Sequence, residues 1–185
     1  MTRTEVDEAH VVLVDDEGGA IGTAPKLSVH HAETPFHLAF SCYIFDTDGR
    51  VLVTRRALGK KAWPGVWTNS CCGHPEPGEP MASAVQRRVG EELGVAIDEP
   101  TCVLPRFRYR AVAPDGIVEN EFCPVFTAVT RDDLRPDPDE VMQWQWVPWP
   151  QLVALADIDW AVSPWAAQQI PLLVSAGIGS DRESA

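Results

Sequence analysis

Residues 73–95 read GHPEPGEPMASAVQRRVGEELGV and combine two local patterns. Its first six residues favour a loop because they include two glycines and two prolines. The remainder predicts a helix that opens at Glu79, has Pro80 near its first position and closes at Leu93-Gly94. The stretch therefore predicts a loop that leads directly into a charged helix.

The predicted helix carries two pairs of opposite charges at a spacing of four residues. Residues four apart lie on one face of a helix, so Arg87 lies beside Glu91 and Arg88 beside Glu92. The plain interpretation is two surface ion pairs, each worth roughly a few tenths of a kcal/mol. A role in binding needs support from other parts of the chain.

Strand patterns and turns alternate along the rest of the sequence. Thr47-Asp48-Gly49 marks a hairpin, and Pro64-Gly65 begins a stretch that we expect to be irregular through Gly78. Hairpins join antiparallel strands, so the expected fold class is α/β (α+β), with helices flanking a mixed β-sheet. We expect strands at 10–15, 38–46, 50–54, 102–112, 120–129 and 143–147, and further helices at 150–157 and 163–176.

The composition is that of one globular domain. The 185 residues are 45% hydrophobic and 23% charged, so we expect a single domain over 1–185 whose tail, 177–185, frays. The net charge of −12 argues against a nucleic-acid partner, because phosphate backbones bind clustered cations. No apolar stretch could cross a bilayer and no secretory signal begins the chain, so we expect no membrane partner and a cytoplasmic location.

Basic residues nevertheless gather in two places. One group lies within seven positions and the other alternates along a predicted strand: Arg55, Arg56, Lys60 and Lys61, and Arg106, Arg108 and Arg110. On an acidic protein such groups favour a small anionic ligand. The alternative is that they only offset the acidic surplus.

The stretch TNSCCGHP at 68–75 raises three possibilities: a zinc knuckle, a disulfide, or a nucleophile with its base. Structural zinc needs CxxC-like pairs, whereas Cys71 and Cys72 are adjacent, point apart and have no second pair after them. The chain holds five cysteines, and a reducing compartment argues against a disulfide framework. We therefore expect free thiols.

Part of the opening stretch resembles the Nudix box, a loop and helix that bind metal. The spacing runs from Gly73 to Glu79, then to Arg87, and ends in Glu91-Glu92-Leu93-Gly94-Val95. One position departs from the box, because Arg88 stands where hydrolytic members have a glutamate that helps to hold divalent cations. A Nudix pyrophosphohydrolase is therefore the alternative function rather than the first.

Five further segments resemble the type I isopentenyl-diphosphate isomerases, a non-hydrolytic branch of the Nudix superfamily. The resemblance covers roughly residues 5–170 and implies a metal-dependent interconversion of isopentenyl diphosphate and dimethylallyl diphosphate through a tertiary carbocation. The other alternative is a binding module that has kept the fold without the activity. The segments are 37–40 (HLAF), 53–74 (VTRRALGKKAWPGVWTNSCCGH), 107–110 (FRYR), 116–126 (GIVENEFCPVF) and 163–165 (SPW).

The same resemblance implies two metal sites. Glu119 and Glu121 leave one face of a strand and can reach one ion; the alternative is that they form the wet face of an edge strand. A second ion, Mg²⁺, is implied on the diphosphate through Glu92. The implied ligands of the first ion, which can be Mn²⁺, Mg²⁺ or Zn²⁺, are His30, His37, His74, Glu119 and Glu121.

The resemblance also implies which residues act on the substrate. Cys72 and Glu121, with Tyr109 beside it, are the implied catalytic groups, and the indole of Trp165 faces the carbocation. Trp63 and Trp67 could line the same pocket, although core packing is the commoner role of a tryptophan. The implied contacts of the diphosphate are Lys26, Arg56, Lys60 and Arg88.

Cys71 competes with Cys72 because the two thiols are neighbours. The family motif places the catalytic thiol directly before Gly-His, which selects Cys72. We expect Cys71 to be a small buried residue, as free cysteines often are, and Cys42, Cys102 and Cys123 to belong to the core as well.

Overall fold

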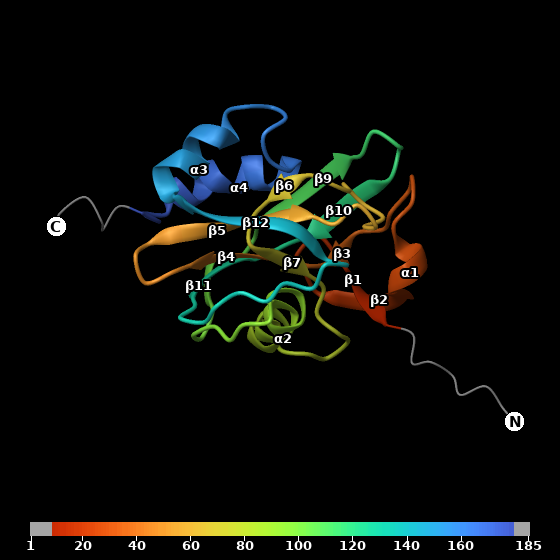
Figure 1. Ribbon diagram of the computed structural model, residues 1–185. Coiled ribbons are helices and arrows are strands. Elements are labelled where there is room, and N and C mark those ends of the chain that lie inside the picture. The colour runs from red at the N-terminus through yellow and green to blue at the C-terminus, as the bar shows by residue number, and fades with distance from the viewer. Residues whose placement is uncertain (1–8, 180–185) are drawn as a thin grey trace, which may run out of the picture.

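The structure is a computed structural model and describes residues 9–179 (Figure 1). Two mixed sheets form its centre. The five-stranded sheet has the order β2 (Ala20–Pro25), β1 (His10–Val14), β3 (His37–Leu38), β10 (Val118–Phe122) and β9 (Arg108–Val112). The larger sheet has the order β12 (Val141–Pro148), β5 (Arg50–Arg56), β4 (Phe40–Phe45), β11 (Val125–Val129) and β8 (Thr101–Leu104). Two short strands complete it: β6 (Trp67–Thr68) pairs with β5 and β7 (Cys71–Gly73) pairs with β4.

Helices cover both faces of the larger sheet. Helix α2 (Met81–Leu93) lies on one face, while α3 (Trp149–Ala156) and α4 (Pro164–Ser175) lie on the other (Figure 1). The alternation along β4 explains this: Ile44 packs against the apolar side of α2, whereas Tyr43 packs in the cluster that includes α3 and α4. A short helix, α1 (Lys26–Val29), follows β2. The predicted α+β class with a mixed sheet is confirmed, although there are two sheets instead of one.

The two long predicted strands, 102–112 and 120–129, are each divided between the sheets. The first becomes β8 and β9, and the second becomes β10 and β11. Proline stands at both breaks, Pro105 and Pro124, and it has no N–H for the ladder. The chain can therefore leave one sheet and enter the next, and this division brings β10 beside β3 and β11 beside β4, both in parallel.

The Nudix-like helix begins two residues later than predicted. Pro80 is its N-cap and Glu79 lies outside it, while Gly94 ends it in the left-handed conformation with φ +66°. The loop before it is more regular than expected, because β6 and β7 occupy part of 66–78. Gly73 in β7 lets α2 come close: an added Cβ there would lie 2.9 Å from Cγ of Arg88.

The end of the chain differs in part from the expected frayed tail. Residues 177–179 form a turn, and Ile178 packs against the core cluster that contains Trp149. The rest of the predicted tail, 180–185, lies outside the described residues. Within residues 9–179, no helix is long and apolar enough to cross a membrane.

Candidate active site

A cavity of about 390 Å³ opens where the two sheets meet α1 and α2. Every residue predicted to be catalytic, to bind the diphosphate or to ligate metal lines it except His37, which lies fully buried beside it. The predicted residues come from segments far apart in the chain, so the fold brings together what the sequence only suggested.

Four of the predicted metal ligands form one compact group. One donor atom from each of His30, His37, His74 and Glu121 lies within 4.8 Å of all the others. Parallel pairing of β3 with β10 places His37 opposite Glu121. Oε1 of Glu121 lies 3.2 Å from Nε2 of His74 and 3.6 Å from Nε2 of His37. Nδ1 of His37 contacts the carbonyl of Pro35 at 2.9 Å, which turns Nε2 toward the group.

Glu119, the fifth predicted ligand, lies at the side of this group. Its Oε2 is 3.1 Å from Nε2 of His30, yet neither buried atom has a hydrogen-bond partner among the described residues. Buried polar atoms without partners are rare, and a cation between nitrogen and oxygen donors would satisfy both. Glu119 and Glu121 are 7% and 6% exposed, so they are not the wet face of an edge strand.

Burial and the contacts among the ligands determine the protonation state of each member of the group. Burial lowers the pKa of His74 to about 4, which keeps its imidazole neutral, the form that binds metal. Burial would raise the pKa of Glu121, but hydrogen bonds with His37 and His74 outweigh it and hold the pKa well below its usual value. Burial and the neighbouring Glu121 raise the pKa of Glu119. The donor set therefore fits a divalent cation.

Tyr109 and Glu121 form a second contact on the same strands. They are opposite each other in the antiparallel pair of β9 and β10, and the Tyr109 hydroxyl donates to Oε2 of Glu121 at 2.9 Å. Burial, followed by the charge of Glu121, raises the pKa of Tyr109 well above its usual value. The phenol therefore stays protonated and acts as a hydrogen-bond donor.

The two adjacent thiols face opposite sides of the larger sheet. Sγ of Cys72 lines the cavity, 3.2 Å from Oδ1 of Asn69 and 3.4 Å from Oγ of Ser41. Sγ of Cys71 lies in the α2 cluster, 3.5 Å from Oε2 of Glu92. Burial raises the pKa of Cys72 to about 11, so it is a neutral thiol at pH 7. Only Cys72 of this pair can meet a ligand in the cavity.

The basic side chains on the other side of the cavity include two that form ion pairs with carboxylates. Arg88 pairs with Glu92 and with Glu140, and Lys60 also pairs with Glu140. Nε of Arg88 is buried without a hydrogen-bond partner in the described chain. Burial, and then the charges of Arg88 and Lys60, lower the pKa of Lys26. This crowding of positive charge is suited to an anion.

Trp165 forms an apolar wall of the cavity. Its Nε1 donates to Oδ1 of Asn69 at 3.0 Å, and the guanidinium of Arg56 lies 5.8 Å from its ring centroid. Trp63 and Trp67 do not line the cavity; they belong to the core cluster or pack against it, which is the commoner role of a tryptophan. Trp63 is buried and packs edge-on against Trp165, with the two ring centroids 5.5 Å apart.

One prediction for the remaining cysteines is wrong. Cys102 is exposed, because it lies on β8 at the edge of the larger sheet, whereas Cys42 and Cys123 are buried as expected. The sequence reasoning missed the polar residues around the cavity. Asn69 stood inside a quoted motif, and Gln169 follows Trp165 by one helical turn; Ser41 and Glu140 gave no signal.

Comparisons with known proteins give relatives over nearly the whole chain. A family model described as the NUDIX domain matches residues 35–169. An isopentenyl-diphosphate Delta-isomerase from Mycolicibacterium vanbaalenii is 61% identical, over 97% of this chain and 98% of the relative. A protein of the same name from Klebsiella pneumoniae is 55% identical, over 84% of this chain and 85% of the relative.

Solved structures show the same fold at lower identity. A protein from Deinococcus radiodurans matches with a TM-score of 0.69 and 16% identity, over 88% of this chain and 98% of that one. The MutT protein from Methanosarcina mazei matches with a TM-score of 0.64 and 17% identity, over 77% and 96%. The match to the domain model and the close relatives place this chain in the NUDIX family, among the isopentenyl-diphosphate Delta-isomerases.

Proposed function

We propose that this protein interconverts isopentenyl diphosphate and dimethylallyl diphosphate in the cavity described above. The relatives at 53–61% identity carry the name of this activity and span most of the chain. The observation that supports the proposal most directly is local: the neutral thiol of Cys72 and the Tyr109–Glu121 pair line one small cavity.

The reaction needs one group that gives a proton to carbon and another that takes one. Protonation of the terminal alkene carbon gives a tertiary carbocation, and loss of a proton from C2 then gives the isomer. Cys72 is the thiol partner in this exchange. Glu121, with the Tyr109 hydroxyl on its Oε2, is the carboxyl partner. No bond to the diphosphate breaks.

The residues of the metal group would hold one Mn²⁺, Mg²⁺ or Zn²⁺. His30, His37 and His74 supply nitrogen, while Glu119 and Glu121 supply oxygen. When bound, the ion supplies positive charge that offsets the two buried carboxylates and fixes Glu121. Glu92 would share a Mg²⁺ with the diphosphate, since it lines the same cavity as the four basic residues.

The cationic side of the cavity would hold the diphosphate. Lys26, Arg56, Lys60 and Arg88 all line it. Lys60 and Arg88 both pair with the carboxylate of Glu140. The diphosphate oxygens would replace this carboxylate as their partner. A firmly held diphosphate matters because the allylic product carries a good leaving group.

The ring of Trp165 would stabilise the carbocation. An aromatic face near a desolvated cation is worth about 2 kcal/mol. Because Trp165 is 2% exposed, water reaches this wall poorly. Exclusion of water also protects the cation from capture.

The pyrophosphohydrolase alternative gains no support from the helix. Glu79 pairs with Arg87, Glu91 pairs with both arginines, and Glu92 pairs with Arg88. These carboxylates pair with arginines, and none of them belongs to the compact metal-binding group found among residues 9–179.

The test is incubation with isopentenyl diphosphate and Mg²⁺ in deuterated water. We expect deuterated dimethylallyl diphosphate and no released phosphate. Release of phosphate without interconversion of the isomers would refute the isomerase proposal. We further propose that the protein works in the cytoplasm on this small diphosphate, without nucleic acid or membrane; its free cysteines accord with a reducing compartment.

A further inference from the structure

Helix α4 presents two polar side chains to the region of Cys72. Trp165 and Gln169 are four residues apart, so they lie on one face of the helix. They are 2% and 0% exposed. Their other buried neighbours on α4, such as Ile170 and Leu173, are apolar.

The first contact passes from Trp165 through Asn69. Nε1 of Trp165 donates to Oδ1 of Asn69 at 3.0 Å, and Sγ of Cys72 lies 3.2 Å from the same oxygen. An indole N–H can only donate, which identifies the oxygen end of the amide. The amide nitrogen donates to the carbonyls of Cys42 at 3.1 Å and Cys71 at 2.9 Å. Asn69 is therefore fixed at both ends.

The second contact passes from Gln169 through Ser41. Nε2 of Gln169 donates to Oγ of Ser41 at 2.9 Å, and this oxygen lies 3.4 Å from Sγ of Cys72. Tyr43 donates to Oε1 of Gln169 at 3.0 Å, which fixes the amide. Because Ser41 accepts from Gln169, its own hydrogen is free for a sulfur, either Cys72 or Cys123 at 3.5 Å.

Packing alone does not account for Gln169. An apolar side chain at this position would extend the apolar face of α4, whereas a buried amide must find partners for every polar atom. Tyr43, Ser41 and Gln169 are each 0% exposed, so they form a closed polar path inside an otherwise apolar cluster. The path ends at the sulfur of Cys72.

We propose that α4 fixes the Cys72 thiol from two sides, through Trp165 and Asn69 and through Gln169 and Ser41. Gln169 is a positioning residue for proton exchange with carbon. Ser41 pairs with Cys72 across β4 and β7, so its backbone is set by the sheet and its hydroxyl direction by Gln169. The inference rests on the proposed role of Cys72.

The test compares Gln169→Met with Gln168→Met. Methionine keeps the length of glutamine but makes no such hydrogen bonds, and Gln168 is the exposed neighbour on the same helix. We expect Gln169→Met to lower kcat about 10- to 100-fold with KM unchanged, because a misplaced group slows the chemical step while the diphosphate contacts stay intact. Gln168→Met should match the unaltered protein.

A double-mutant cycle asks whether Gln169 acts through Ser41. We expect Ser41→Ala and Gln169→Met to lower kcat together no more than the stronger single change does. Purely additive losses, an effect on KM alone, or equal activity of the Gln168 and Gln169 variants would each overturn the inference.

Two further variants keep the outcome decisive. If Gln169→Met does not fold, Tyr43→Phe removes only the hydroxyl that holds Gln169, and we expect kcat to fall several-fold at constant KM; an unchanged kcat would overturn the inference. Cys72→Ala separates the two proposals. If Cys72→Ala is inactive while Gln169→Met is fully active, only the positioning role fails; if Cys72→Ala is active, the proposed site fails.

Discussion

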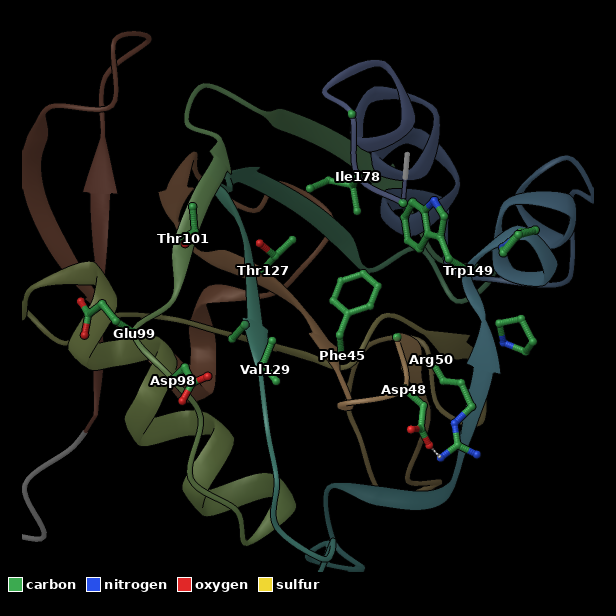
Figure 2. A pocket seen from close by; sticks show the side chains of 16 residues that line it. Phe45, Asp48, Arg50, Asp98, Glu99, Thr101, Thr127, Val129, Trp149 and Ile178 are labelled. Atoms are coloured by element: carbon green, nitrogen blue, oxygen red, sulfur yellow. Dashed lines mark hydrogen bonds and ion pairs between the residues drawn. The ribbon is translucent and has the colours of Figure 1, made fainter. Parts of the chain in front are cut away.

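Two cavities of the described chain differ in the charge and burial of the side chains that line them. The larger, about 720 Å³, lies at another end of the molecule between β11, α3 and the turn 177–179. Figure 2 shows Phe45, Trp149 and Ile178 along it, with charged side chains at its rim. The smaller, about 390 Å³, holds the proposed active site.

The difference lies in where the charges are and what pairs with them. In the larger cavity, Asp48 pairs with Arg50 of the same turn, and their side chains are 73% and 49% exposed. In the smaller one, the side chains of His74 and Glu121 are 14% and 8% exposed, and they come from segments far apart in the chain. Buried charges that depend on distant partners, rather than volume, mark a site of chemistry.

The largest expected effect is at the thiol and the carboxylate of the smaller cavity. Cys72→Ala and Glu121→Gln should each lower turnover by at least about 1000-fold, because each removes a proton-exchanging group. Circular dichroism should show an intact fold. Cys71→Ala is the matched control and should change kcat little, since its sulfur faces α2. Equal losses of turnover at both cysteines would contradict the assignment of Cys72 as the catalytic thiol.

The next effect is at the charged face of α2. Arg88→Met should raise KM and reduce the free energy of unfolding by about 3 kcal/mol, because Glu92 would be left buried without its partner. Denaturant titration measures the second quantity. Arg87→Met is the control, and its more exposed pairs should contribute within about 1 kcal/mol. Equal losses of unfolding free energy at both arginines would contradict the expected difference between the Arg88–Glu92 pair and the more exposed pairs of Arg87.

The third effect is on the pH dependence of stability without metal. His74 has a folded pKa of about 4 against an ordinary value of 6.5, so unfolding takes up a proton between these values. The metal-free protein should therefore lose stability as the pH falls from 6.5 toward 4. Urea titrations at several pH values measure this slope. His74→Gln should flatten it, whereas His31→Gln, at an exposed loop position, should not.

The smallest effect is expected in the larger cavity. Asp98 pairs with Arg131 at 2.8 Å, and both side chains are more than half exposed. Asp98→Asn should leave kcat and KM unchanged and alter the free energy of unfolding little, because solvent screens an exposed pair. A clear loss of isomerase activity would show that the two cavities are coupled, and it would contradict the conclusion that only the smaller one contributes to activity.

Local pattern predicted much of the fold but not its division into two sheets. The helix near 79–94 and the strands at 50–54 and 143–147 follow from periodicity and turns, because these signals lie within a few residues. The split of 102–112 and 120–129 depends on which distant strand each half meets. Pro124 could have indicated the break, but nothing local assigns β10 to β3 and β11 to β4.

The same limit applied to the site. The resemblance supplied Cys72, Glu121, Arg56, Lys60 and Arg88 because they stand in contiguous motifs, and all of them line the cavity. Gln169 and Ser41 could not be predicted as site residues, because their importance depends on their contact with each other. They are 128 positions apart in the chain, yet Nε2 of Gln169 lies 2.9 Å from Oγ of Ser41. Glu140 could not be predicted for the same reason, since its partners Lys60 and Arg88 precede it by 80 and 52 positions.

The parallel pairing of β3 with β10 also bears on how the protein folds. His37 and Glu121 become neighbours only after the intervening chain has closed a long loop, and such pairings form slowly because their entropy is lost before their contacts are gained. No hairpin or isolated helix of this chain can assemble the ligand group in advance. Metal binding should therefore not precede the pairing of β3 with β10, and it would mark a late stage of folding rather than its beginning.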